Sequence, residues 1–129
     1  MAGWAVIPTI RVPDMDAAIA FYRDKLGFRL DRDDYSPVNN SLVRGDARIQ
    51  LETPGDLFGS GYNEAIRRRM DSVSATTLYM EADDIDELYA RVGELGITIV
   101  DPLGERPWNL REFTIEDHRG HWLTFWKRD

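Results

Sequence analysis

Two stretches of this 129-residue chain resemble each other and decide its fold: IPTIRVPDMDAAIAFYRDKLGF (residues 7–28) and TLYMEADDIDELYARVGELGI (residues 77–97). Each begins with a short strand-like run and continues with an aspartate, Asp14 or Asp84, placed to cap a helix. Each ends in Leu-Gly, and Gly27 and Gly96 can take the left-handed conformation that terminates a helix. The similarity indicates an internal repeat. The alternative is chance similarity between two amphipathic strand–helix units.

The interior of both stretches has the apolar spacing of an amphipathic helix. The apolar positions are Met15, Ala18, Ile19, Tyr22 and Leu26 in the first stretch, and Ile85, Leu88, Tyr89, Val92 and Leu95 in the second. After each helix the sequence predicts strands, with tight turns at Gly45-Asp46 and at Arg119-Gly120. A further short helix is expected near residues 61–72, with Ile66 and Met70 on one side.

These elements predict an α+β protein of two βαβββ modules in tandem. Their expected bounds are about 5–54 and 77–128, joined by a connector at 55–76, within a single domain of residues 1–129. Helices cover only one face of each sheet, so we expect them on the outer face of a curved mixed sheet. The inner face would then surround a concave cavity, closed by the other module, a second subunit or a ligand.

The composition narrows the classes of partner. A formal net charge of −7 disfavours nucleic acids and anionic membranes as partners. The chain has no cysteine, which excludes disulfides, thiolate catalysis and cysteine-based zinc sites. No apolar run is long enough to span a membrane, and the N-terminal residues do not resemble a signal peptide, so we expect a cytoplasmic protein.

The arrangement and two motifs resemble the vicinal oxygen chelate superfamily, the glyoxalase and bleomycin-resistance fold. The segment AIAFYRDKLGF (18–28) resembles the first helix of that family, and ERPWNLREFTIEDHRGHWLTFW (105–126) resembles its C-terminal signature. Together with DELYARVGELG (86–96), the likeness is greatest to the bleomycin-resistance branch. The sequence departs from the signature at Asn109, where glycine is usual, and at His118, where proline is common.

Enzymes of this superfamily hold one divalent metal with His and Glu side chains from four sheet positions. By resemblance those positions fall near Ile7, Gln50, Thr77 and Thr124, and none of these is a carboxylate or an imidazole. A catalytic divalent metal needs about three protein donors. The sequence therefore predicts no metal, no cofactor and no catalytic residues.

The resemblance instead implies a ligand cleft lined by aromatic and acidic side chains. The residues expected to contact the ligand are Trp108, Tyr79, Tyr35, Trp122, Thr124, Glu81, Glu52 and Gln50. Asp33 and Asp34 are expected to add negative charge, and Trp4 to pack in an N-terminal arm exchanged between subunits. For Trp122 and Trp126 a place in an interface core is an equal alternative. Arg111 and Glu112 are expected to form pairs within the strand or at an interface.

Three functions follow from this interpretation. The favoured one is a metal-free homodimeric protein that sequesters a bleomycin-type cationic antibiotic without turnover. The second is a metal-dependent lyase, isomerase or dioxygenase of the same fold, which needs ligands that the sequence does not supply. The third is a binding protein for another planar metabolite, because one fold serves many functions.

Overall fold

The computed structural model describes residues 6–32, 34–55, 59–70 and 75–128, which leaves Trp4 and Asp33 outside the described residues. The chain divides into two compact units, residues 1–72 and 73–129. Within the described stretches, no helix is long and apolar enough to cross a lipid bilayer.

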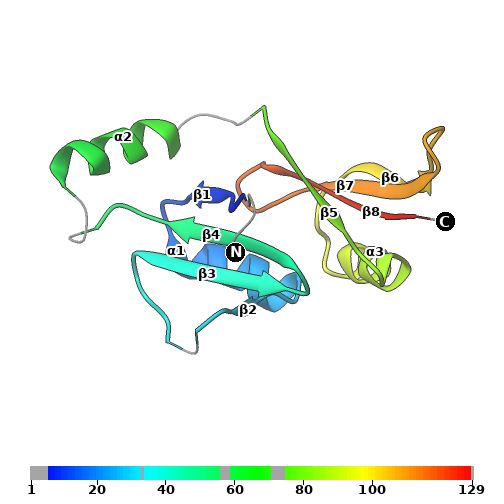
Figure 1. Ribbon diagram of the computed structural model, residues 1–129, viewed down its shortest axis with the longest axis horizontal. Helices are drawn as coiled ribbons and strands as arrows, with labels where there is room; N and C mark the ends of the chain where they lie inside the picture. The colour runs from blue at the N-terminus through cyan, green and yellow to red at the C-terminus, as the bar shows by residue number, and fades with distance from the viewer. Residues whose placement is uncertain (1–5, 33, 56–58, 71–74, 129) are drawn as a thin grey trace, which may run out of the picture. The chain divides into compact units, whose positions relative to one another are not determined.

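The first unit is a four-stranded sheet with a helix on one face (Figure 1). Its elements are β1 (Thr9–Arg11), α1 (Met15–Ile19), η1 (Ala20–Lys25), β2 (Arg29–Leu30), β3 (Asn39–Arg44), β4 (Ala47–Glu52) and α2 (Ser60–Met70). The strand order is β1-β4-β3-β2, and only the β1–β4 pair is parallel. The helix α2 packs on this unit through Ile66, which is fully buried.

The second unit repeats this topology (Figure 1). Its elements are β5 (Thr77–Glu81), α3 (Ile85–Glu94), β6 (Ile99–Glu105), β7 (Leu110–Glu116) and β8 (Trp122–Arg128). The order is β5-β8-β7-β6, again with one parallel pair, β5–β8. The predicted α+β class and the two βαβββ modules are therefore confirmed, while the module bounds and the concave cavity stay predictions.

The helix boundaries follow the sequence signals. Asp14 caps α1 by accepting a hydrogen bond from the Ala17 amide at 3.2 Å, and Gly27 and Gly96 end the two helices with φ of 83° and 69°. Asp84 is at the N-cap of α3, although its side chain makes no capping hydrogen bond.

The first helix contains one feature that the sequence analysis did not predict, a π-helical segment at Ala20–Lys25. Gly27 follows Asp14 by 13 residues, whereas Gly96 follows Asp84 by only 12. A π turn contains one residue more than an α turn, so it accommodates the additional residue between the N-cap and the glycine.

Alternation along the strands separates the core from the opposite face of each sheet. In the second unit Leu123 and Phe125 are buried on the helix side, where Phe113 packs 5.3 Å from Phe125 and 5.0 Å from Tyr89 between ring centres. In the first unit Ile49 and Leu51 have the same place under the helix. Of the ten apolar helix positions only Leu95, at the C-cap of α3, is exposed.

Candidate ligand-binding site

The face of the second sheet opposite α3 carries the polar and aromatic side chains of the candidate site. The strand register places these residues in three rows across β5, β8 and β7: Thr77–Trp122–Glu116, Tyr79–Thr124–Thr114 and Glu81–Trp126–Glu112. Directly paired residues share a face of a sheet, so each row lies on this side. We call this set of nine residues, together with Trp108 from the β6–β7 loop, the aromatic face.

The centre of the aromatic face is the carboxylate of Glu112. Its Oε1 accepts hydrogen bonds from the Tyr79 hydroxyl and from Trp108 Nε1, the latter at 2.6 Å. The residue is an acid but only 7 % exposed, and its strand β7 lies between β8 and β6 in the sheet. Its Oε2 accepts no hydrogen bond from the described residues, yet it is not among the fully enclosed polar atoms. One carboxylate oxygen is thus fixed by the protein and the other is available.

Aromatic rings surround this carboxylate. Tyr79 and Trp126 are stacked, with ring centres 6.4 Å apart and planes inclined by 25°. The side chains of Trp108 and Tyr79 are 57 % and 51 % exposed, and Trp122 is also exposed. Large exposed aromatic surface has an unfavourable contact with water, so a flat apolar group bound against it would be stabilised.

The Tyr79 hydroxyl remains a hydrogen-bond donor over a wide pH range. Burial of the hydroxyl raises the pKa of Tyr79, and the hydrogen bond to Glu112 and its negative charge raise it further. Removing the Tyr79 proton would place two anions against each other. The phenol therefore stays protonated and holds the Glu112 carboxylate in place.

The β6–β7 loop positions Trp108 through a backbone conformation that depends on Asn109. This residue has φ of 66°, in the left-handed region that glycine adopts without strain and asparagine tolerates better than most residues. The turn is closed by hydrogen bonds from the Asn109 amide to the Arg106 carbonyl and from the Arg106 amide to the Leu110 carbonyl. The departure from the signature glycine at Asn109 therefore preserves the loop geometry.

The side chain of Arg106 also stabilises this loop. Its guanidinium donates to the backbone carbonyls of Pro102 and Glu112 and forms an ion pair with Asp101 at 2.9 Å. This cation is therefore used to hold backbone and Asp101, and it forms no ion pair with the Glu112 carboxylate.

Thr124, which the sequence predicted as a ligand contact, lies in the middle of the aromatic face but is nearly covered. Its hydroxyl and that of Thr114 form a hydrogen bond at 2.7 Å, and both residues are buried. Each hydroxyl therefore has a partner inside the protein. The role of Thr124 that the geometry supports is to join β7 to β8 beneath the rings.

The corresponding face of the first unit is polar and internally paired. Glu52 is 6 % exposed, and its Oε1 forms an ion pair with Arg11 at 3.2 Å and accepts from the Tyr62 hydroxyl at 2.9 Å. Its Oε2 accepts from the Asn39 side chain at 3.2 Å. Gln50 accepts from the Thr9 hydroxyl at 3.2 Å. Glu52 and Gln50, both predicted ligand contacts, thus have protein partners, and Arg11 compensates the charge of Glu52.

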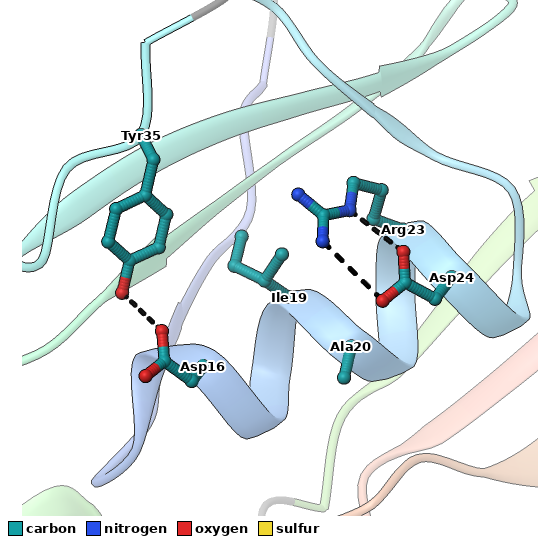
Figure 2. A pocket seen from close by; sticks show the side chains of 6 residues that line it. All are labelled: Asp16, Ile19, Ala20, Arg23, Asp24 and Tyr35. Carbon is teal, nitrogen blue, oxygen red and sulfur yellow. Dashed lines mark hydrogen bonds and ion pairs between the residues drawn. The ribbon is translucent and has the colours of Figure 1, made fainter.

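Tyr35 lies away from the face that carries Gln50 and Glu52. Figure 2 shows its ring beside α1, with the hydroxyl donating to Asp16 at 2.6 Å. A shallow pocket of 290 Å³ lies there, lined by Asp16, Ile19, Ala20, Arg23, Asp24 and Tyr35. Ile19 is part of the buried helix side of this unit, so the structure places Tyr35 on the helix side of the first sheet.

Comparison with known proteins shows where this chain belongs. The model of the Glyoxalase/Bleomycin resistance protein/Dioxygenase superfamily matches residues 4–125. The chain belongs to this superfamily. A bleomycin resistance protein of Geobacillus stearothermophilus is 31 % identical over 128 residues, which cover 95 % of each chain. A bleomycin resistance protein of Staphylococcus aureus matches to the same extent.

Solved structures share the fold of this superfamily member. TioX from Micromonospora sp. ML1 superposes with a TM-score of 0.71 at 22 % identity, covering 98 % of this chain and 100 % of TioX. A lactoylglutathione lyase from Agrobacterium tumefaciens gives a TM-score of 0.70 at 23 % identity, covering 98 % of this chain and 95 % of the lyase. At these identities the likeness concerns the fold alone.

The four positions that the superfamily resemblance assigned to metal ligands are not direct partners across the two parallel strand pairs. Gln50 pairs across the parallel ladder with Thr9, not Ile7, and Thr124 pairs with Tyr79, not Thr77. None of these four positions provides an imidazole or a carboxylate, and no group of three His, Cys, Asp or Glu side chains suited to a metal occurs among the described residues. This donor set does not fit a catalytic metal.

In this superfamily member the structure brings together five of the eight predicted site residues on one face: Trp108, Tyr79, Trp122, Thr124 and Glu81. The sequence analysis missed the central residue, Glu112, which it expected to pair within the strand or at an interface. A signal was present, because the turn at Arg119-Gly120 fixes the β7–β8 register and so places Glu112 opposite Trp126.

Proposed function

We propose that this protein binds a bleomycin-type cationic antibiotic, one molecule per chain of a homodimer, and sequesters it without chemical change. The observation that carries the proposal is the Glu112 carboxylate held between Tyr79 and Trp108 on an exposed aromatic face. Rings provide rigid contact area for a flat heteroaromatic group, and the carboxylate provides charge for a cation.

The relatives and the chemistry of the residues support binding over turnover. Curated proteins named bleomycin resistance protein match 95 % of the chain at 31 % identity. The side chains on the aromatic face are carboxylates, hydroxyls and aromatic rings, and they do not include a histidine or a metal-ligand set. Sequestration needs only affinity, and stacking with charge complementarity supplies it.

The experiment that tests this function is an isothermal titration with metal-free bleomycin. For the wild-type protein we expect the titration to show saturable binding with one drug per chain, and sedimentation velocity to show a dimer. Trp108→Ala removes an exposed ring and the donor to Glu112, so we expect at least about tenfold weaker binding.

The matched control is Leu95→Ala, which truncates an exposed apolar side chain at the end of α3 in the same unit. Its affinity should equal that of the wild type. Absence of heat and of saturation with wild-type protein at high micromolar drug would reject the bleomycin assignment. Retained binding of another planar compound in that case would identify a different ligand for the aromatic face.

A further inference from the structure

We propose that Glu112 is the residue that selects the charge of the ligand, and that the group it accepts is a flat organic cation with N–H donors, such as a protonated aminoheteroaromatic ring. This inference rests on the proposed function, because it assigns the chemical class of the group bound on the aromatic face. Under this inference, the second unit alone recognises both the flat ring of the ligand and its positive charge, and the Glu112 carboxylate binds the charge.

The first support is that the Glu112 carboxylate has no ion pair among the described residues. Glu112 is almost completely buried, and among the described residues no Lys, Arg or His forms an ion pair with its carboxylate. Arg106 is bound to Asp101 and to backbone carbonyls, and Arg111, next in sequence, is paired with Asp86 on the helix side at 2.6 Å. A carboxylate removed from water without a cation is unfavourable, so a bound cation would be stabilised there.

The second support is that the two oxygens of the Glu112 carboxylate have different surroundings. Oε1 accepts from two neutral donors, the Tyr79 hydroxyl and Trp108 Nε1, which restricts rotation of the group. Oε2 has no donor among the described residues and is not enclosed. A ligand N–H that reaches Oε2 would form a charge-assisted hydrogen bond to an acceptor already fixed in orientation.

The third support is the shape of the surroundings, which favours a flat cation over an alkylammonium. The stacked pair of Tyr79 and Trp126 and the exposed ring of Trp108 surround the carboxylate. A planar cation can lie against a ring face while its in-plane N–H points to Oε2. The ring faces also attract positive charge, which adds to the preference. Glu81, in the same row, adds negative charge at the edge of the face.

The test uses two probes of nearly the same shape and different charge. At neutral pH 4-aminoquinoline is protonated, whereas quinoline is neutral. We expect the wild-type protein to bind the cation at least about tenfold more tightly than the neutral probe, as one charge-assisted hydrogen bond implies. Binding is measured by calorimetry or by tryptophan fluorescence.

The decisive variant is Glu112→Gln, which removes the charge and keeps a carbonyl oxygen that can accept from Tyr79 and Trp108. We expect the cation to lose affinity until both probes bind within about twofold of each other, with quinoline affinity unchanged. The control Glu94→Gln removes one negative charge from an exposed position on α3 of the same unit. It should keep the full preference for the cation, which separates a specific contact from the general acidity of the protein.

The inference would be overturned if the wild-type protein bound the two probes with equal affinity, or bound neither of them. It would also be overturned if the Glu112→Gln variant kept the preference for 4-aminoquinoline. Titration of metal-free bleomycin into the same proteins distinguishes this failure from that of the proposed function. Equal drug affinity for wild type and Glu112→Gln would retain the function and reject the role of Glu112. Loss of cation preference in Glu112→Gln without any bleomycin binding would retain the role of Glu112 and reject the drug.

Discussion

The same row of the repeated sheet has opposite electrostatics in the two units. In the first unit the row is Arg11–Glu52–Asn39, and in the second it is Glu81–Trp126–Glu112. Each row contains a nearly buried glutamate, 6 % exposed at Glu52 and 7 % at Glu112. Arg11 compensates the first carboxylate, whereas the second has only neutral donors, from Tyr79 and Trp108.

From this difference we propose that one topology serves structure in one copy and recognition in the other. The Glu52 cluster uses both carboxylate oxygens and includes Tyr62 of α2, so it fastens that helix to the first sheet. The Glu112 cluster leaves one oxygen and several ring faces available. Charge pairing within the protein stabilises the fold, and an unpaired buried charge is the kind of feature found at functional sites.

The largest expected effect comes from removing the compensating cation. Arg11→Met leaves the buried Glu52 carboxylate without its ion pair, so the free energy of unfolding should fall by about 2–3 kcal/mol. The double variant Arg11→Met/Glu52→Gln should recover most of that loss in urea unfolding. Glu112→Gln should change stability by less than about 1 kcal/mol, because that carboxylate loses no cation. Equal losses in Arg11→Met and Glu112→Gln would remove the contrast between the two units.

A smaller difference in stability is expected between the two units when a hydroxyl contact in the neighbouring row is removed. Thr124→Val leaves the buried Thr114 hydroxyl without its partner at 2.7 Å, which should cost about 1–2 kcal/mol. In the same row of the first unit, the contact from Thr9 to Gln50 at 3.2 Å is only partly buried, and Thr9→Val should cost less than about 0.5 kcal/mol. Both values are measured by urea unfolding.

The double variant Thr114→Val/Thr124→Val provides the control for that row, because it replaces both hydroxyls by methyl groups of similar size. It should be more stable than Thr124→Val alone. A double variant that is less stable than the single one would show that packing, and not the unpaired hydroxyl, determines the loss.

The smallest effect is expected on the helix side of the second sheet, at the exposed pair of Asp86 and Arg111. The Arg111 hydrogen bonds hold the pKa of Asp86 below its ordinary value of 3.8. The pair therefore stabilises the fold fully above the unfolded-state pKa, and this contribution is lost as the pH falls through the lower folded-state pKa.

The variant Asp86→Asn should accordingly have a slightly lower urea midpoint than the wild type at neutral pH, and the two midpoints should converge in acid. High salt should reduce the small difference at neutral pH, because the pair is exposed. A difference that grows as the pH falls would contradict the lowered pKa.

Much of the fold follows from short-range signals in the sequence. Asp14 and Gly27 mark the ends of the first helix, and Gly45 and Gly120 mark turns, because each depends on local backbone conformation and nearby hydrogen bonds. The π turn at Ala20–Lys25 was not predicted, since it becomes visible only when both repeats are compared for length. The direct partners of Gln50 and Thr124, which are Thr9 and Tyr79, could not be predicted, because the register of a parallel pair is set by strands distant in sequence.

The sequence by itself determined that this chain has two βαβββ modules, that Trp108 belongs to the loop of the family signature, and that the four positions matched to metal ligands by resemblance carry neither imidazole nor carboxylate. Only the tertiary structure decided which glutamate is compensated. Arg11 and Glu52 are 41 positions apart, and Tyr79 and Glu112 are 33 apart. Pairing over such distances depends on strand register and burial, so two acidic residues that look alike in sequence acquire different partners in the folded protein.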